Sequence, residues 1–425
     1  MTFGARLGER LSRLVAVREL KGAALFSASS VVLNLASLAA GFLVYRWLDP
    51  YYMGIWQTMV LVQTYCNFLT LGVANGMNRE LPYVLGRGEV ERGHRMAATT
   101  QAFSLWVGAL SLVGFAVALW FVPDDASWRM SIAALGAIVP VSFYTQYLQG
   151  TFRANADFDR LSVIQLVDAG LRVASVALVY FFGYAGYCAR AVALGMAVAV
   201  LTYAWRPIRV RSTFSWSTLK ELCRTGIPIF AFSYVFGFAD SIPRLVLLNE
   251  DTVETLGLYA PVLTLLGTMN AFFDSLRAYL YPKVSHYLGR RNDDARGLWR
   301  PTFAIHLLSV LSAIPVALAG VWLIPLVVEH FMPRYMGSLE ALNVGLVIIL
   351  FLGYRIGATL LTALKSWRYL ALFVGCFLVL QWALPMLFLA WFPPLLAVSW
   401  GQAASAAVML GVSLLVNRLA MRAGE

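Results

Sequence analysis

Long apolar runs recur from one end of this chain to the other. Of its 425 residues, 60% are hydrophobic and 13% are charged, and the mean hydropathy is +0.70. A soluble domain carries about twice this share of charged residues, because its surface must be solvated. A helix of about 20 mainly apolar residues crosses the hydrocarbon core of a bilayer with its backbone hydrogen bonds made internally. The composition therefore predicts an all-α integral membrane protein.

We expect about twelve transmembrane helices, each formed by one apolar run. Their approximate spans are 22–45, 52–77, 97–122, 130–150, 162–183, 184–205, 226–248, 257–281, 302–328, 339–364, 369–392 and 395–416. The basic segment 1–21 precedes an apolar run longer than a signal-peptide core, so we expect the first helix to be retained. Leu7, Leu11 and Leu14 have the spacing of an interfacial helix.

The Lys and Arg residues alternate between the two sides of the predicted bundle. If the N-terminus is cytoplasmic, 25 of the 33 lie in cytoplasmic segments. The opposite connections hold only Arg46, Arg129, Arg190 and Arg334. Because basic loops are retained on the cytoplasmic side, we expect both termini in the cytoplasm. The net charge of +11 then faces the anionic inner leaflet rather than nucleic acid.

Two charged stretches share a Leu-Gly-Arg core, "NRELPYVLGRGEVERG" at 78–93 and "YLYPKVSHYLGRRNDDARG" at 279–297. Gly86 and Gly289 within them are 203 residues apart, and the same offset separates Gly54 from Gly257. A constant offset indicates a duplicated six-helix unit, with chance likeness of two membrane loops as the alternative. We interpret the first stretch as part of a cytoplasmic loop, 78–96, and the second as its counterpart.

An even number of helices in each unit leaves the two halves parallel, which predicts two lobes around a central cavity. The expected divisions are a basic cytoplasmic segment at 1–21, an N-terminal six-helix lobe at 22–205, a cytoplasmic linker at 206–225, a C-terminal six-helix lobe at 226–416 and a cytoplasmic tail at 417–425.

Four segments carry a resemblance to a known family. They are "YRWLDPYYMGIWQTMV" (45–60), "LGVANGMNRELPYVLGRGE" (71–89), "TGIPIFAFSYVFGFADSIPRLVLLN" (225–249) and "LGLYAPVLTLLGTM" (256–269). They resemble the polysaccharide transporter branch of the multidrug/oligosaccharidyl-lipid/polysaccharide (MOP) exporter superfamily, the Wzx-like flippases. The family pattern Leu-Gly-Pro before the second helix reads Leu48-Asp49-Pro50 here.

The resemblance implies a two-lobed, twelve-helix transporter in the bacterial inner membrane. Its expected substrate is an undecaprenyl-pyrophosphate-linked oligosaccharide, such as an O-antigen, capsule or exopolysaccharide repeat, moved from the cytoplasmic to the periplasmic leaflet. We expect alternating access coupled to H⁺ or Na⁺, with membrane lipids, a glycan polymerase and export machinery as partners. Because the four cysteines and four histidines are dispersed, we expect no metal, no other cofactor and no enzymatic activity.

Seven charged side chains fall inside the predicted spans. They are Arg172, Arg244, Arg277, Arg355, Asp168, Asp240 and Asp274. An ionised group near the bilayer centre costs about 3 kcal/mol, so these side chains should face protein or a water-filled cavity. They sum to one net positive charge.

Six of the seven are spaced as local pairs. The pairs are Asp168 with Arg172 and Asp240 with Arg244, four residues apart, and Asp274 with Arg277, three apart. Each spacing places both partners on one helix face. The alternative to a functional role is that the two charges of a pair only neutralise each other. For Asp168 with Arg172 the sequence favours neither interpretation. The resemblance implies that the seventh and eighth helices line the cavity, so we expect Asp240 and Asp274 to bind the ion or gate the lobes. Asp168, in the span 162–183, is a weaker candidate for the same role.

Arg355 has no acidic residue within one helical turn, which predicts an unbalanced buried cation. A guanidinium holds a pyrophosphate in bidentate fashion. We therefore expect Arg355 to bind the pyrophosphate, helped by Arg277, Arg244 and Arg172; bonding to carbonyl groups or snorkelling to the interface is the alternative.

Arg79 and Glu80 lie at the cytoplasmic end of the second predicted helix. We expect Arg79 to receive the lipid head group and Glu80 to act in gating. A solvated loop is the alternative for both residues.

Two other functions remain open. A multidrug or cation antiporter of the same superfamily would need an acidic pocket, and the buried charges here are net positive. A membrane-embedded glycan polymerase or ligase would need a catalytic loop, and no outer connection exceeds about ten residues.

Overall fold

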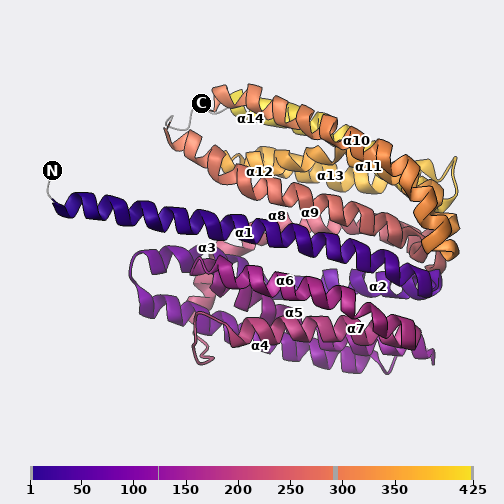
Figure 1. Cartoon of the computed structure of the whole chain (residues 1–425), viewed down its shortest axis with the longest axis horizontal. Helices are drawn as coiled ribbons and strands as arrows, with labels where there is room; N and C mark the ends of the chain where they lie inside the picture. Colours follow the sequence, from indigo (N-terminus) through magenta and orange to yellow (C-terminus); the bar gives the residue numbers. More distant parts are fainter. Residues whose placement is uncertain (1–2, 123, 291–294, 423–425) are drawn as a thin grey trace. The chain divides into compact units, whose positions relative to one another are not determined.

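The structure is a computed structural model that describes residues 3–122, 124–290 and 295–422 (Figure 1). Over these ranges the chain is almost entirely helical and contains no strand, so the all-α prediction is confirmed. Among the described residues, ten helices are long and apolar enough to cross a membrane.

The helices have the following bounds in chain order: α1 (Phe3–Trp47), α2 (Pro50–Cys66), η1 (Asn67–Thr70), α3 (Val73–Gly86), α4 (Val90–Ala118), α5 (Ala126–Ala154), α6 (Phe158–Ala174), α7 (Val176–Ala204), α8 (Trp216–Glu250), α9 (Val253–Arg290), η2 (Arg296–Leu298), α10 (Trp299–Phe331), η3 (Pro333–Ser338), α11 (Leu339–Phe351), η4 (Leu352–Tyr354), α12 (Arg355–Ala363), α13 (Trp367–Phe388) and α14 (Pro394–Arg422). The η elements are 3₁₀ turns.

Three of the twelve expected spans are helical but interrupted, and one of them, 339–364, consists of α11, the 3₁₀ turn η4 and α12. The span predicted at 52–77 consists of α2, the 3₁₀ turn η1 and α3, with Leu71 and Gly72 in the left-handed backbone region. The span predicted at 162–183 contains the end of α6 and the start of α7. Gly183 has φ +56°, a conformation that glycine adopts without a Cβ clash, so the chain can turn there before the next span.

The charged stretch after the second span is mostly helical, which corrects the expected loop at 78–96. α3 continues to Gly86, a short turn follows, and α4 already begins at Val90. In the same way α9 continues to Arg290, and α1 begins at Phe3 without a separate interfacial helix. Hydropathy marks only the part of a helix in the hydrocarbon, whereas Glu, Leu and Arg favour helix beyond it.

Asp49, where the chain departs from the family pattern, caps the start of α2. Its Oδ1 accepts a hydrogen bond from the backbone N–H of Tyr51 at 3.0 Å, and Pro50 occupies the first helical position. An aspartate followed by a proline is a common helix start, because the side chain satisfies an otherwise unpaired N–H and proline needs none.

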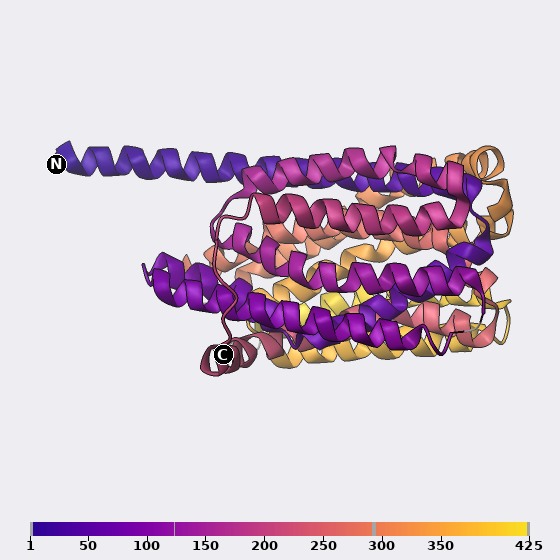
Figure 2. The same cartoon turned by 90° about the horizontal axis from the view of Figure 1, so that it is seen from below.

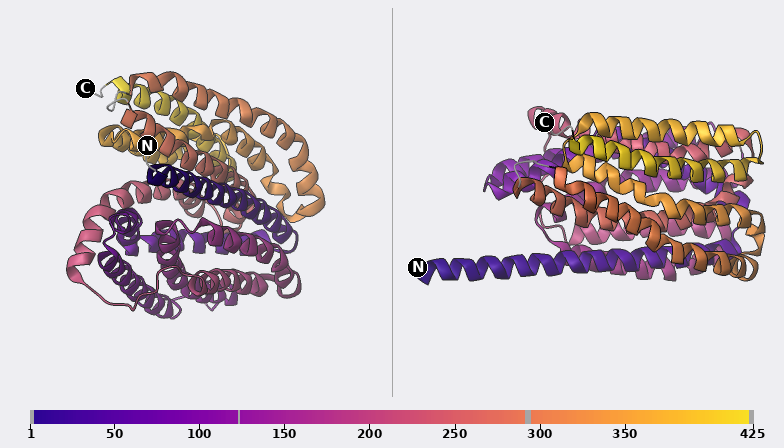
Figure 3. Two further views of the ribbon diagram at one scale, coloured as in Figure 1. Left: turned by 60° about the vertical axis from the view of Figure 1, so that its left-hand side comes forward. Right: turned by 90° about the horizontal axis from the view of Figure 1, so that it is seen from above.

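The chain forms two compact units. The N-terminal unit comprises Met1–Ser37 and Cys66–Ala231, and the C-terminal unit comprises Leu38–Tyr65 and Phe232–Glu425. In the first unit α4 packs on α5 and α5 on α7; in the second α13 packs on α14 and α10 on α11. Within each unit the helices run side by side, among them α4 to α7, purple to magenta, in the first and α10 to α14, orange to yellow, in the second (Figures 2 and 3). The lobe boundaries expected from the sequence stay a prediction.

Gly54 and Gly257, the two glycines related by the 203-residue offset, lie where the starts of α2 and α9 approach each other closely in the C-terminal unit. A Cβ on Gly54 would lie 1.8 Å from the carbonyl oxygen of Val253, and one on Gly257 would lie 1.7 Å from that of Pro50. Any side chain would therefore force the starts of α2 and α9 apart. Gly86, from the other repeated pair, has open space where a Cβ would stand.

Candidate functional site

Arg355 is the first residue of α12, directly after the 3₁₀ turn η4, and it is 7% exposed. Two glycines bring this segment close to its neighbours. A Cβ on Gly353 would lie 2.9 Å from Cβ of Ser309 in α10, and a Cβ on Gly357 would lie 2.0 Å from Oγ of Ser413 in α14. The backbone on either side of Arg355 therefore packs directly against α10 and α14, which buries the arginine.

Arg355 forms an ion pair with Asp240 of α8. Nη2 of Arg355 donates to Oδ1 of Asp240 at 2.5 Å, and the guanidinium lies 5.1 Å from the ring centre of Phe236 and 5.6 Å from that of Tyr354. The expectation that Arg355 is an unbalanced cation is therefore wrong. Its partner lies 115 residues away, where no local spacing could indicate it.

Arg244 lacks the local ion pair that the sequence predicted for it. Asp240 pairs with Arg355 instead, and Arg244 has no ion-pair partner among the described residues. Its Nε is buried without a hydrogen-bond partner in the described part of the chain. The unbalanced buried cation is thus Arg244, one helical turn after the carboxylate that was expected to neutralise it.

Asp274 and Arg277 form the expected local pair on α9. Nη1 of Arg277 lies 2.7 Å from Oδ1 of Asp274, and its Nε donates to Oγ1 of Thr359 in α12 at 2.8 Å. The Asp274 side chain is 62% exposed, so this carboxylate is accessible.

Arg277 also lines a cavity of about 410 Å³ inside the C-terminal unit. The other lining residues are Phe232, Ser233, Phe236, Ala358, Thr359, Thr362, Leu370 and Val374. The Phe236 ring, which lines this cavity, also lies against the Arg355 guanidinium, so a single side chain separates Arg355 from the cavity. The structure therefore gathers five of the seven predicted buried charges in one unit, with a net charge of +1.

Asp168 and Arg172 lie on α6 in the N-terminal unit and pair with each other. Both Nε and Nη2 of Arg172 donate to Oδ2 of Asp168 at 3.1 Å. Arg190 of α7 in turn donates to the backbone carbonyl of Arg172 at 3.1 Å. This geometry favours the self-neutralising interpretation of the pair.

Arg79 and Glu80 both lie on α3, where the Arg79 side chain is exposed and Glu80 is half-buried. Neither residue forms an ion pair with another residue that the structure describes. Their roles in receiving the head group and in gating stay predictions.

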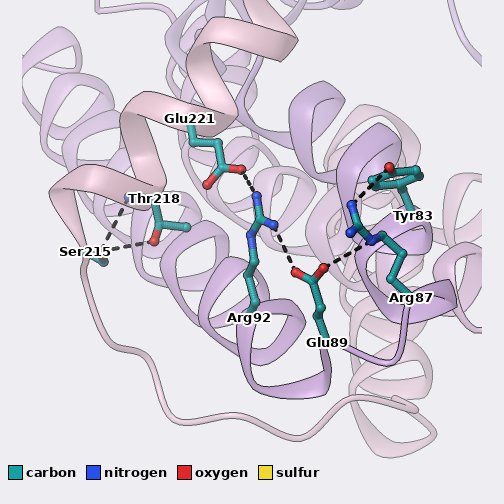
Figure 4. Close-up of polar contacts among 7 residues, drawn as sticks. All are labelled: Tyr83, Arg87, Glu89, Arg92, Ser215, Thr218 and Glu221. Atoms are coloured by element: carbon teal, nitrogen blue, oxygen red, sulfur yellow. Dashed lines mark hydrogen bonds and ion pairs between the residues drawn. The ribbon is translucent and has the colours of Figure 1, made fainter.

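Arg92 of α4 lies between two carboxylates in the N-terminal unit (Figure 4). The sequence did not predict this ionic cluster. The Arg92 guanidinium donates to Glu89 at 2.9 Å and to Glu221 of α8 at 2.5 Å. Arg87 contacts the other carboxylate oxygen of Glu89 at 3.2 Å. The cluster joins the starts of α4 and α8, which lie far apart in sequence.

Ser215 stands immediately before α8, next to this cluster (Figure 4). Its Oγ accepts from the backbone N–H of Thr218 at 3.4 Å. A serine three residues before the bonded N–H is a helix-start signal that the sequence does contain.

Comparison with known proteins identifies the family. Residues 28–333 match the polysaccharide biosynthesis protein family, which covers more than half of the chain. Comparison with curated protein sequences finds no significant match.

Solved structures share the fold at low sequence identity. A multidrug resistance MATE family transporter of the MOP superfamily in the inward-facing conformation matches with a TM-score of 0.77 at 15% identity, covering 95% of this chain and 98% of that one. The outward-facing conformation of a multidrug resistance MATE family transporter of the MOP superfamily matches with a TM-score of 0.68 at 14% identity, covering 96% of each chain. A MOP superfamily transporter from Pyrococcus furiosus, described as having a binding pocket of reversed polarity, matches with 0.69 at 15% identity and the same coverage. The chain therefore belongs to the polysaccharide biosynthesis protein family and has the fold of MOP superfamily transporters.

Proposed function

We propose that this protein moves undecaprenyl-pyrophosphate-linked oligosaccharides from the cytoplasmic to the periplasmic leaflet of the bacterial inner membrane by alternating access. This proposal rests on the excess of positive charge in the C-terminal unit, where the described residues place Arg244, Arg277 and Arg355 with two carboxylates, Asp240 and Asp274. The family and the transporter fold support a membrane transporter in polysaccharide biosynthesis. The charge balance supports an anionic substrate.

A pyrophosphate is costly to move through a low-dielectric medium unless fixed positive charges accompany it. Arginine suits this task because its planar fork binds two phosphate oxygens at once. Arg277 already lines the cavity, and Arg244 has a buried Nε without a partner in the described chain. These two residues can meet the phosphates before Arg355 leaves Asp240.

The Arg355–Asp240 pair offers a route to ion coupling. When a phosphate binds Arg355, the Asp240 carboxylate loses its counter-charge and can take up H⁺ or Na⁺ instead. The Asp240 side chain is 37% exposed, so a cation can reach it, and Asp274 is more exposed still. Substrate binding to Arg355 and ion binding to Asp240 would then favour each other, because each of them breaks the same pair, and this links them in one conformational cycle.

The experiment is transport of a fluorescent undecaprenyl-pyrophosphate oligosaccharide across proteoliposomes, alongside restoration of surface glycan in a deletion strain. We expect flipping by the wild-type protein and loss of flipping in Arg244→Ala. The matched control is Arg129→Ala, which removes the arginine of an exposed pair, 2.6 Å from Asp124. Drug resistance on expression, with no flipping and no effect on surface glycan, would instead establish multidrug export.

A further inference from the structure

His306 of α10 is 2% exposed and lies in a buried chain of hydrogen bonds. Its Nδ1 is 2.8 Å from the carbonyl oxygen of Thr302, and its Nε2 is 2.9 Å from Oγ of Ser413 in α14. The Ser413 hydroxyl in turn lies 3.2 Å from the carbonyl oxygen of Tyr354, to which it donates. That carbonyl belongs to the peptide unit that joins Tyr354 to Arg355.

The number of hydrogen-bond donors in this series of contacts depends on whether the His306 ring is neutral or doubly protonated. Nδ1 faces a carbonyl oxygen, so it must carry a hydrogen, and a neutral imidazole then has only a lone pair on Nε2. In that state Nε2 needs the Ser413 hydroxyl as a donor, and the carbonyl of Tyr354 loses it. Only the doubly protonated ring donates from both nitrogens and leaves the Ser413 hydroxyl free to donate to Tyr354. All three hydrogen bonds can therefore form at once only when His306 carries both hydrogens.

We propose that His306 binds a proton during the transport cycle, and that its proton on Nε2 turns the Ser413 hydroxyl onto the carbonyl of Tyr354. The protonation state of His306 thereby changes the bonding of the peptide unit that carries Arg355. The coupling role rests on the proposed transport function, whereas the proton site itself rests only on the geometry.

The surroundings favour an added donor at this place. Oδ1 of Asn417, one helical turn after Ser413, is buried without a hydrogen-bond partner in the described chain. Gly357 permits the close approach of α12 to Ser413, so a change in this hydroxyl is transmitted directly to the segment that follows Arg355. Acceptors outnumber donors around a neutral His306, and a proton supplies the missing donor.

His306 is held by hydrogen bonds to the Thr302 carbonyl and the Ser413 hydroxyl, and it forms no ion pair with another residue that the structure describes. The ionisable groups on its end of α10 and on the neighbouring elements, among the side chains that the structure describes, are Arg300 on α10, Tyr354 on η4, Arg355 on α12, and Arg418 and Arg422 on α14. Those toward the opposite end are Glu329 and His330 on α10, Arg334 and Tyr335 on η3, and Glu340 on α11. Among the described residues no carboxylate lies at the His306 end, and the Arg355 charge is already paired with Asp240.

The first test follows the four histidine rings by ¹⁵N NMR in the full-length protein in nanodiscs, with His306→Gln to assign the signal. We expect the His306 ring to change from a singly to a doubly protonated form as the pH is lowered within the range in which the protein stays folded. Ser413→Ala should move this transition to lower pH by about one unit, because the charged ring loses the stronger bond. Ser399→Ala, at another buried serine of α14, should leave it unchanged. A His306 ring that keeps one neutral form throughout this range overturns the proton site.

The second test is the pH profile of flipping in proteoliposomes. The wild-type rate should change across the pH range in which the His306 signal titrates, and the rate of His306→Gln should not. His330→Gln is the matched control, because His330 is an exposed histidine at the other end of the same helix. A wild-type protein whose His306 titrates but which flips no lipid-linked sugar refutes the proposed function and leaves the proton site standing. A His306→Gln protein that flips with the unchanged wild-type pH profile refutes the coupling role.

Discussion

Arg355 and Asp240 are joined by a hydrogen bond of 2.5 Å between Nη2 and Oδ1, although 115 residues separate them in the chain. The pair connects α12 to α8, and the Arg355 guanidinium lies against Phe236, which lines the same cavity as Arg277. Because the arginine is buried and the aspartate is half-exposed, an anionic substrate can displace the Asp240 carboxylate while Arg355 stays in place. This asymmetry underlies the first two predictions.

Substitutions of Arg355 should distinguish the effect of its positive charge on activity from the effect of its planar, two-pronged shape. Lysine keeps the positive charge but loses the planar fork, so Arg355→Lys should retain partial activity, whereas Arg355→Ala and Arg355→Glu should lose nearly all of it. The measurement is restoration of surface glycan in a deletion strain, with the membrane abundance of each variant checked by blot. Full glycan from normally abundant Arg355→Ala would make Arg355 a structural residue.

Removing one partner of a buried pair destabilises a protein by about 3–5 kcal/mol, and the half-exposed Asp240 should reduce this to the lower end. The double variant Arg355→Gln with Asp240→Asn leaves no unpaired charge. We expect it to recover thermal stability without recovering transport, and recovery of both would argue against a role of the pair in the cycle.

The carboxylates Asp240 and Asp274 should carry the response to an ion gradient. With both changed to Asn, neither Arg–Asp pair of the C-terminal unit can exchange its arginine for a cation, so gradient-dependent flipping in proteoliposomes should be lost. The control is Asp124→Asn, at an aspartate that is 89% exposed and paired with Arg129. Unchanged rates with unchanged gradient dependence in the double variant would exclude both residues as coupling sites.

The close contact at Gly54 should not tolerate a side chain. Gly54→Val places a Cβ within 1.8 Å of a backbone oxygen, and overpacking of this kind costs about 1–3 kcal/mol. We expect a lower thermal midpoint in detergent, measured by intrinsic fluorescence. Gly86→Ala is the control, because a Cβ there meets open space and its effect should stay within about 1 kcal/mol. Equal midpoints for the two variants would show that α2 and α9 separate without cost.

The Arg92 cluster should contribute little to stability. Arg92, Glu89 and Glu221 have side chains that are 41%, 34% and 39% exposed, so water and salt screen their attraction. Arg92→Ala should lower the thermal midpoint only slightly at low salt and even less at 1 M salt. A larger and salt-independent loss in thermal denaturation would contradict this interpretation.

The predicted topology can be checked with reporter fusions. Both termini should be cytoplasmic, so a C-terminal alkaline phosphatase fusion should be inactive. A fusion at Asp251, in the acidic connection between α8 and α9, should be active. The reverse pattern at either position would overturn the orientation that the Lys and Arg distribution indicates.

Much of the fold could be predicted because the bilayer imposes a length on each helix. The apolar runs marked ten helices that are long enough to span a membrane, but the breaks in the other two spans depend on Leu71, Gly72 and Gly183, whose backbone angles hydropathy does not record. Helix ends were misplaced at 78–96 for the same reason. The membrane ends there, and the helix continues to Gly86.

Local charge pairs were also readable, because a helix brings residues three or four apart onto one face. Asp168 with Arg172 and Asp274 with Arg277 pair as that geometry predicts. The same rule failed for Asp240, which has a local candidate in Arg244 but bonds to Arg355.

The sequence by itself determined the class of protein, the approximate helices and the presence of buried charges, since each depends on composition or on neighbours along one helix. Only the tertiary structure decided that Asp240 belongs to Arg355, that Arg244 is left without an ion pair in the described chain, and that His306 reaches Tyr354 through Ser413. These choices depend on how α8, α10, α12 and α14 pack. The competition between a partner one turn away and one 115 residues away is settled by distance in space, which no local pattern encodes.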